Sequence, residues 1–449
     1  MSPLTPERAR ELFQMVEAEA RSHGVQDIEL SVGETSEALT RFANNAIHQN
    51  VAEKNLGISV RPQENGRTAR ADTNRLDADS VLRTVRDSIA LMRSQEPDDR
   101  LLALAAPEPL VKLARLAEST VSCTPSQRAA AVAEAIRIAE SHGQTTAGIY
   151  STGHSREALC NSRGVFGWHE QSMAVFSITM METGSSGWAK ASEVDRSGLD
   201  VAALARRASD KARHSRNPRE LAPGRYTVIL EPAAVLDLVG QMFGDFGGTA
   251  IEDQRSFLTG RIGTQLFGEN ITIEDDFTHP LQAGPAFDGE GVARRRLTLV
   301  ERGVVKDLAY SRGAAQRAGK QPTGHGLALP NDVGEFPINI VFTGGATSLD
   351  RMIRSTERGI LVTRLWYIRE VDPYEKMMTG MTRDGTFLIE GGEVVGGIRN
   401  FRFNQGLIEL LKNVESLGPA VRASGEEAFD MVAPALKAHE FHFTEVTRF

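Results

Sequence analysis

Residues 359–402 read GILVTRLWYIREVDPYEKMMTGMTRDGTFLIEGGEVVGGIRNFR. The first part of this stretch, residues 359–371, is a long run of β-branched and aromatic residues, which is typical of a strand. Two glycine-containing breaks, Arg383-Asp384-Gly385 and Gly391-Gly392, divide the remainder. Further strands are predicted over residues 378–382, 386–390 and 394–402. Connections this short join antiparallel neighbours, so the stretch predicts an antiparallel sheet.

The same pattern continues on both sides of this stretch. Residues 295–310 predict a hairpin around the turn Glu301-Arg302-Gly303, and a helix over residues 407–414 ends the meander. Upstream, Ala222-Pro223-Gly224 marks a boundary near residue 220. We therefore expect residues 221–449 to form a C-terminal domain with a large antiparallel sheet and helices on one side.

The first half of the chain reads as a duplication. Thr5-Pro6 and Thr124-Pro125 each begin a helix, with threonine placed to cap it and proline in its first turn. Strand-rich segments follow, with Asn65-Gly66 as a hairpin turn in the first copy, and each copy closes with an amphipathic helix. The two copies cover about residues 5–95 and 124–217. We expect an α+β N-terminal domain over residues 1–220.

The composition is that of an ordinary globular protein. Of 449 residues, 41% are hydrophobic and 24% charged, which suits two or three domains with cores of their own. The net charge of −8 argues against a general affinity for nucleic acids or anionic membranes. No apolar run reaches the ~18 residues of a membrane span, and residues 1–13 lack the apolar core of a secretory signal. We therefore expect a cytoplasmic protein with neither nucleic acid nor membrane as a partner.

Residues 231–288 contain the features most typical of a functional site. Pro232 suits the first turn of a mostly apolar helix, which three glycines between residues 244 and 248 then break. Acidic residues follow at 252–253 and 274–276. Many enzymes place an apolar helix and a glycine-rich turn beside carboxylates in this way. A buried helix followed by a flexible turn and a solvated acidic loop produces the same pattern.

Two groups of residues in the second half are candidate metal ligands. The zinc motif His-Glu-x-x-His is absent, and His439-Glu440-Phe441-His442 is expected in an exposed edge strand or tail. Oxygen-rich ligands with an imidazole could bind a divalent metal if the loops of the second half converged. The members of this candidate cluster are Asp275, Asp276, Asp288, Glu290 and His325. Their spacing is equally typical of tight glycine turns, so both interpretations stay open.

Several segments occur in an order that resembles a known family. They are FDGEGV at residues 287–292, PTGHG at 322–326 and TGMTRDGTFLIEGG at 379–392, preceded by GISVR at 57–61. By these segments the chain resembles the TldD/PmbA family, the "modulator of DNA gyrase" proteins, whose members are metal-dependent peptidases or their partners. The resemblance covers nearly the whole chain.

The resemblance implies a zinc site whose ligands this chain lacks. TldD-type members carry His-Glu-x-x-x-His on the helix that corresponds to the one beginning at Pro232, and take a further ligand from a cysteine near the C-terminal end. Counting back without gaps from Ser256, the corresponding residues here are Val239, Gly240, Gln241, Met242, Phe243 and Gly244. They include neither imidazole nor the glutamate that could activate a metal-bound water, and no cysteine follows Cys160. The chain therefore resembles the PmbA branch, also called TldE, and we expect no metal and no catalytic residue in it.

The resemblance also implies a role beside a catalytic subunit. On this interpretation the chain is a pseudoenzyme that forms a dimer and helps bind an extended peptide. A TldD-like subunit would supply zinc and catalysis for the proteolysis of unfolded or leader peptides. A heterodimer with that subunit and a homodimer both stay open. Two other functions stay open as well: an active metallopeptidase that uses the candidate cluster as a displaced metal site, and a non-enzymatic binding module that acts on another protein.

Overall fold

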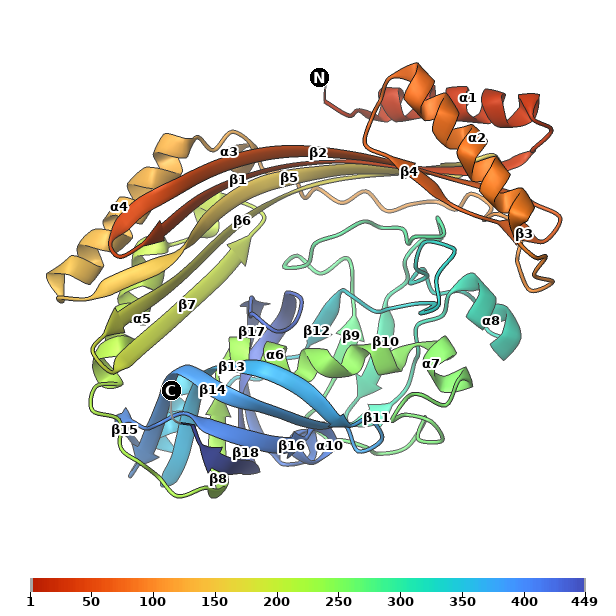
Figure 1. Ribbon diagram of the computed structural model, residues 1–449. Coiled ribbons are helices and arrows are strands. Elements are labelled where there is room, and N and C mark those ends of the chain that lie inside the picture. The colour runs from red at the N-terminus through yellow and green to blue at the C-terminus, as the bar shows by residue number, and fades with distance from the viewer. Residues whose placement is uncertain (1–2, 448–449) are drawn as a thin grey trace.

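The computed structural model describes residues 3–447 and contains two sheets, each with its own helices (Figure 1). The N-terminal sheet has seven strands in the order β3-β2-β1-β5-β6-β7, and β4 pairs with β2. These strands are β1 (Asp27–Ala43), β2 (Ala46–Glu64), β3 (Arg67–Thr68), β4 (Ala71–Thr73), β5 (Thr145–Asn161), β6 (Phe166–Glu182) and β7 (Ser185–Glu193). All their pairings are antiparallel.

The two copies meet through their first strands, because β1 pairs with β5 along most of its length. The N-terminal helices are α1 (Pro6–Ser22), α2 (Ala78–Ser94), α3 (Glu118–Val121), α4 (Pro125–Ser141), η1 (Arg196–Gly198) and α5 (Val201–His214). The side chain of Thr5 caps α1, and Thr124 caps α4 in a capping box with Gln127. Asn65 and Gly66 both have positive φ in the tight turn between β2 and β3. These local predictions are confirmed.

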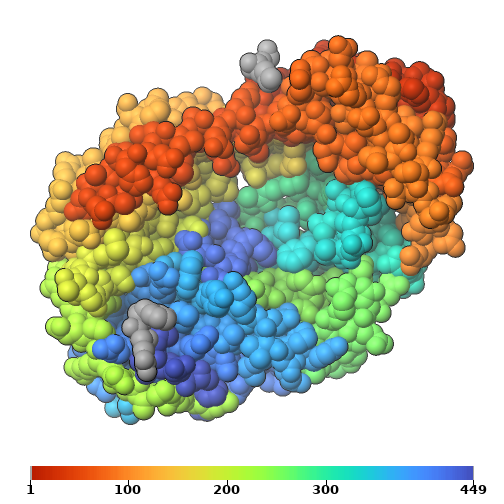
Figure 2. Space-filling model, in the orientation of Figure 1, coloured from red at the N-terminus to blue at the C-terminus, as the bar shows by residue number. Residues whose placement is uncertain are grey.

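Two hydrophobic cores hold the helices against opposite ends of the long strands. The first core joins α1 and α2 to β1 and β2, and the second joins α4 and α5 to β5, β6 and β7. The strands between them curve over the C-terminal part of the molecule (Figure 1). In the space-filling view this N-terminal part, coloured red to yellow, lies above the C-terminal part, coloured green to blue (Figure 2). No helix of residues 3–447 is long and apolar enough to cross a membrane.

The C-terminal sheet has eleven strands in the order β11-β10-β9-β12-β18-β16-β14-β13-β8, with β15 beside β14 and β17 beside β18. The strands are β8 (Gly224–Leu230), β9 (Ile273–Asp275), β10 (Leu297–Glu301), β11 (Val304–Val305), β12 (Ile340–Phe342), β13 (Arg358–Asp372), β14 (Met377–Glu390), β15 (Glu393–Gly397), β16 (Phe401–Gly406), β17 (Val414–Ala423) and β18 (Met431–Val446). The predicted α+β fold class is confirmed. The pairings β12–β18 and β13–β8 are parallel, which was not predicted.

The C-terminal helices are α6 (Pro232–Val239), η2 (Gly240–Phe246), α7 (Gly248–Glu252), α8 (Arg312–Ala318), α9 (Leu349–Arg354) and α10 (Leu407–Lys412). The apolar helix that begins at Pro232 changes to a 3₁₀ helix already at Gly240, not at the glycines between residues 244 and 248. Every residue of η2 except Gln241 and Gly244 is buried, because the segment continues into the main C-terminal core.

Three predictions about this sheet were wrong. Its helices do not all lie on one side, because α6 packs into the main core on one face and α9 into a small cluster on the other. Arg383-Asp384-Gly385 does not separate two strands but lies within β14, where the register against β13 shifts in a bulge. Asp384 and Gly385 take positive φ there, and the Asp384 carboxylate pairs with Arg364. The segment from His439 to His442 is not an edge strand or tail, because it lies in β18, which has neighbours on both sides.

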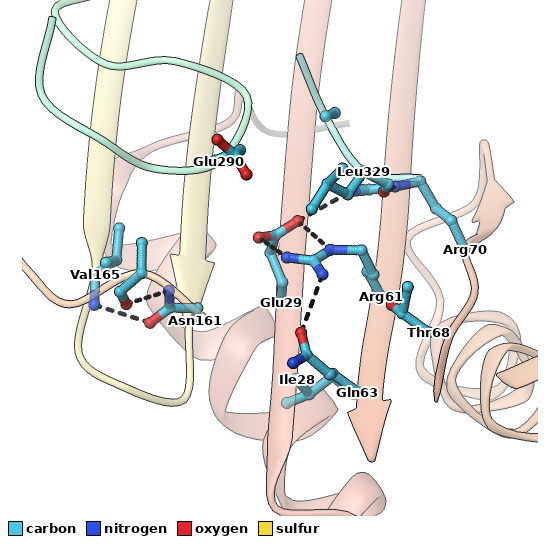
Figure 3. Close-up of polar contacts among 12 residues, drawn as sticks. Ile28, Glu29, Arg61, Gln63, Thr68, Arg70, Asn161, Val165, Glu290 and Leu329 are labelled. Carbon is cyan, nitrogen blue, oxygen red and sulfur yellow. Dashed lines mark hydrogen bonds and ion pairs between the residues drawn. The ribbon is translucent and has the colours of Figure 1, made fainter. Parts of the chain in front are cut away.

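A buried ion cluster connects the two sheets (Figure 3). Glu29 of β1 is fully buried and accepts hydrogen bonds from the guanidinium groups of Arg61, at 2.7 and 3.1 Å, and Arg70, at 2.8 Å. Burial acts to raise the pKa of Glu29, but the two arginines outweigh it and hold the pKa below its usual value. Arg70 also donates to the carbonyl oxygen of Leu329, 2.7 Å away in the C-terminal part. The cluster therefore fixes the two parts relative to each other.

Candidate functional site

The helix α6 and its 3₁₀ continuation form the floor of the candidate site. Pro232 occupies the first turn, where no intrahelical N–H bond is lost, and the side chains of residues 234–239 are buried. A Cβ atom on Gly240 would lie 2.5 Å from the Cβ atom of Ala428. The helix therefore packs directly against residues 424–430, which form the connection between β17 and β18 and are called the 424–430 loop here.

Two polar side chains of α6 and η2 hold this loop. Asp237 Oδ1 accepts hydrogen bonds from the backbone N–H groups of Glu426 and Glu427, both at 2.9 Å. Gln241 Nε2 donates to the carbonyl oxygens of Asp237, at 3.1 Å, and Glu427, at 3.0 Å. A Cβ atom on Gly425 would lie 2.1 Å from Asp237 Oδ1, so the close approach requires glycine there.

Asp237 is fully buried, and its second oxygen, Oδ2, has no hydrogen-bond partner among the described residues. Burial raises the pKa of Asp237 to about 6, although the two N–H donors of the loop act in the opposite direction. The carboxylate therefore stabilises the 424–430 loop at the cost of its own desolvation.

The loop in turn covers part of β13. Glu427 accepts hydrogen bonds from the backbone N–H groups of Tyr367, at 2.8 Å, and Ile368, at 3.2 Å. β13 pairs with β8 only over Ile360–Val362, so beyond that point it has β14 as its one strand neighbour within residues 3–447. The Glu427 carboxylate therefore occupies the hydrogen-bonding edge of β13 where a further strand could pair.

Zinc does not fit the segment from Val239 to Gly244. Met242 and Phe243 are fully buried in the apolar core, and the amide of Gln241 is engaged with two carbonyl oxygens. Zinc sites use thiolate, imidazole or carboxylate ligands, and the segment presents none of these groups. No step of catalysis can therefore be assigned to these residues through a metal.

The members of the candidate cluster lie in the same region but do not converge. His325 Nε2 lies 3.2 Å from Asp275 Oδ1, and both side chains are fully buried. Burial acts to raise the pKa of Asp275, but His325, Arg294 and the Asn339 N–H together outweigh it and the pKa lies below its usual value. Asp276 instead accepts hydrogen bonds from the N–H and hydroxyl groups of Thr278. Within residues 3–447, no three His, Cys, Asp or Glu side chains are placed to hold a metal ion together.

Asp288 and Glu290 shape the backbone of their own loops. Asp288 accepts hydrogen bonds from the N–H groups of Glu290, Val292 and Gly326, while Glu290 accepts one from Arg312. Burial, followed by the nearby Asp288 carboxylate, raises the pKa of Glu290 to about 7. These acids act as turn-stabilising groups, which is the alternative that their spacing left open.

Sequence reasoning missed the residues that define this site, Asp237 and Glu427. Asp237 is the one acidic residue within the apolar run PAAVLDLVG, and an acid at a position that should be buried is a signal of a specific partner. Glu427 carried no such signal, because its partners Tyr367 and Ile368 lie about 60 residues away in the sequence.

Family models match most of the chain. Residues 223–445 match the PmbA/TldA metallopeptidase C-terminal domain, residues 106–216 its central domain and residues 28–91 its domain 1. The crystal structure of TldE from Thermococcus kodakarensis shares the fold, with a TM-score of 0.87 at 20% identity over 97% of this chain and 100% of that chain.

Relatives in sequence carry metalloprotease names. Metalloprotease PmbA of Escherichia coli O157:H7 is 23% identical over 399 residues, which cover 85% of this chain and 85% of that protein. A metalloprotease of Methanothermobacter thermautotrophicus is 27% identical over 237 residues, 50% of this chain and 49% of its own length. The chain thus spans about half the length of this archaeal relative, and 43% of that of another archaeal relative. Because the three matched domains follow one another along the chain, this protein belongs to the PmbA/TldD family.

Proposed function

We propose that this chain is a non-catalytic subunit that pairs with a TldD-like, zinc-dependent peptidase subunit. The contacts of Asp237 and Gln241 are the observation that carries the proposal. In this chain Asp237 and Gln241 hold the 424–430 loop, and the segment from Val239 to Gly244 has no group that could bind zinc or activate water. The partner would supply zinc, base and chemistry.

Exposed apolar side chains along the β13–β14 hairpin support the partner contact. Tyr367 within β13, and Val371 and Tyr374 near the hairpin end, are 52%, 60% and 59% exposed. Exposed aromatic and large apolar side chains are common contacts in protein interfaces, where tyrosine often dominates. The hairpin end is continuous with the 424–430 loop through Glu427, so a subunit bound there would lie beside the candidate site.

The edge of β13 supports a role in holding an extended peptide. Tyr367 and Ile368 lie in a bulge of β13, so both of their N–H groups point toward Glu427. A carbonyl oxygen of an extended peptide could accept these two hydrogen bonds in place of the Glu427 carboxylate. Displacing Glu427 from this edge would give unfolded or leader peptides a main-chain binding site without any sequence preference of its own.

The proposal is tested by producing the chain alone, a TldD-type relative alone and the two together. Peptide cleavage and zinc content are then measured for each preparation. We expect a stable complex, zinc bound by the relative, and cleavage that needs the relative and becomes faster with this chain. Peptide cleavage by this chain alone would contradict the proposal. So would a relative that forms no complex with this chain and cleaves peptides equally fast without it.

A variant at the hairpin end separates assembly from folding. Val371→Glu with Tyr374→Glu should abolish the complex while leaving the circular dichroism of the isolated chain unchanged. As a control, Val395→Glu changes a side chain of similar type and 38% exposure on β15, and the complex should survive this substitution.

A further inference from the structure

A groove of about 970 Å³ lies on the other side of the C-terminal sheet from α6. Its lining residues come from α5 on one side and from strands of the C-terminal sheet on the other. Strand residues alternate between the two faces, so Ile360 and Val362 join α6 in the main core while Leu361 faces the groove. The groove reaches the first residue of α6, Pro232, but none of its lining residues is Asp237, Gln241 or a member of the 424–430 loop.

The floor of the groove is apolar. Leu361, Phe387 and Ala435 come from β13, β14 and β18, and they belong to a small hydrophobic cluster that also includes Met352 of α9. The floor residues themselves are buried, since Leu361, Phe387 and Ala435 are only 7%, 3% and 7% exposed. The apolar surface that remains accessible lies at the margin of the groove, where Val421 is 43% exposed.

One wall of the groove is positively charged. The residues of α5 that line it recur at helical spacing and are Ala203, Arg206, Arg207, Asp210, Lys211 and His214. Within residues 3–447, the exposed side chains of Arg206 and Arg207 make no hydrogen bond or ion pair.

Each carboxylate that lines the groove already has a cationic partner. Asp210 pairs with Arg213, Glu231 with Lys211 at 2.7 Å, and Asp350 with Arg354 at 3.8 Å. The charge of Arg206 and Arg207 is therefore left without a counter-charge beside an apolar surface.

We propose that this groove binds an amphipathic helix with an acidic flank, supplied by a partner protein. A strand could not add to the floor by main-chain pairing, because Leu361, Phe387 and the β18 residues around Ala435 have paired strands on both sides. Recognition must use side chains, and a helix that lies between α5 and α9 would place leucine-type residues above the floor and against the exposed apolar margin at Val421. Its acidic flank would face Arg206 and Arg207.

The probe for this proposal is a fluorescein-labelled peptide of about four helical turns, with leucines along one face and glutamates on one flank. The first control peptide has the same composition in scrambled order, and the second has lysine in place of glutamate. Fluorescence anisotropy with the full chain should show saturable binding of the acidic amphipathic peptide and of neither control peptide. The affinity for the acidic peptide should fall as the salt concentration rises.

Matched variants locate the binding. The double variant Arg206→Glu/Arg207→Glu and the single variant Val421→Asp should each weaken binding about tenfold or more. Arg83→Glu/Arg137→Glu makes the same charge change at exposed arginines of α2 and α4 away from the groove. Val395→Asp changes an apolar side chain of similar exposure outside the groove. Both controls should bind within about twofold of the unchanged chain.

Three results overturn the proposal. In the first, the scrambled peptide or the lysine peptide binds with the same affinity as the acidic peptide. In the second, the acidic peptide binds with the same affinity to the Arg206/Arg207 variant and to the control variants. The third result is that vesicles of anionic lipid bind to the chain through Arg206 and Arg207, whereas the peptide does not bind. This result would identify a membrane surface as the occupant of the groove. None of these results bears on assembly with a peptidase subunit, because the groove and the hairpin end share no residues.

Discussion

The two faces of the C-terminal sheet are built differently. On the inner face, α6 and η2 lie within the main core, and nearly every polar group near them is bound, by Asp237, Gln241 or Glu427. On the outer face, a small buried cluster around Leu361 and Phe387 lies beneath a groove whose margin exposes Val421. Arg206 and Arg207 line this groove and have no ionic partner within residues 3–447. The inner face is therefore filled by contacts within the chain, while the outer face has a groove with accessible side chains at its margin.

Truncation of one large side chain on the inner face should have the largest effect. Phe246 is fully buried in the main core, so Phe246→Ala should lower the free energy of unfolding by about 3–5 kcal/mol, from lost transfer energy and the cavity left behind. Chemical denaturation followed by tryptophan fluorescence measures this change. A loss below about 1 kcal/mol would show that the inner face is not tightly packed.

The pH dependence of Asp237 tests the cost of holding the 424–430 loop. As the pH rises, the unfolded chain ionises near 3.8 and the folded chain only near 6, so between these values the unfolded state binds fewer protons. Stability should therefore fall from pH 3.8 to about 6 and then level off. The shift corresponds to at most about 3 kcal/mol.

The variant Asp237→Asn has no carboxyl group at this position, so its stability should lack this pH dependence. We expect the unchanged chain to lose stability relative to the variant between these two pH values, measured as the difference between their unfolding free energies at each pH. A difference that is constant across this range would mean that Asp237 ionises normally.

Glu427→Gln should loosen the edge of β13. The amide keeps one acceptor but loses the charge that strengthens both hydrogen bonds, so a loss of about 1–2 kcal/mol is expected. Hydrogen exchange at the amides of Tyr367 and Ile368 should accelerate. Glu426→Gln serves as the control, because the Glu426 side chain pairs with Lys190 at 3.3 Å and does not touch β13; equal acceleration in both variants would contradict the assignment.

The smallest effect is expected on the outer face. Val421→Ser changes a side chain that is 43% exposed, and stability should change by less than about 0.5 kcal/mol. The same substitution should weaken the binding of the acidic peptide, so that binding and stability respond independently. A large loss of stability would instead place Val421 in the structural core.

Local signals accounted for much of the fold. Thr5 and Thr124 cap their helices, Asn65-Gly66 forms its turn and Gly319 ends α8 in a left-handed conformation, because each depends on only a few neighbouring residues. Arg383-Asp384-Gly385 has the same local signal as a turn, yet it forms a bulge. Its Asp384 carboxylate binds Arg364 on the adjacent strand, a contact that the local sequence does not contain.

The sequence by itself determined the α+β class, the caps of α1 and α4 and the absence of zinc ligands between Val239 and Gly244, since these follow from residue type and short-range geometry. Only the tertiary structure decided what replaces those ligands. Asp237 and Gln241 reach a loop nearly 190 residues away in the chain, and Glu427 reaches back to β13. Such hydrogen bonds form only after the sheet has brought distant segments together, because closing loops of this length has an entropic cost that local contacts cannot offset.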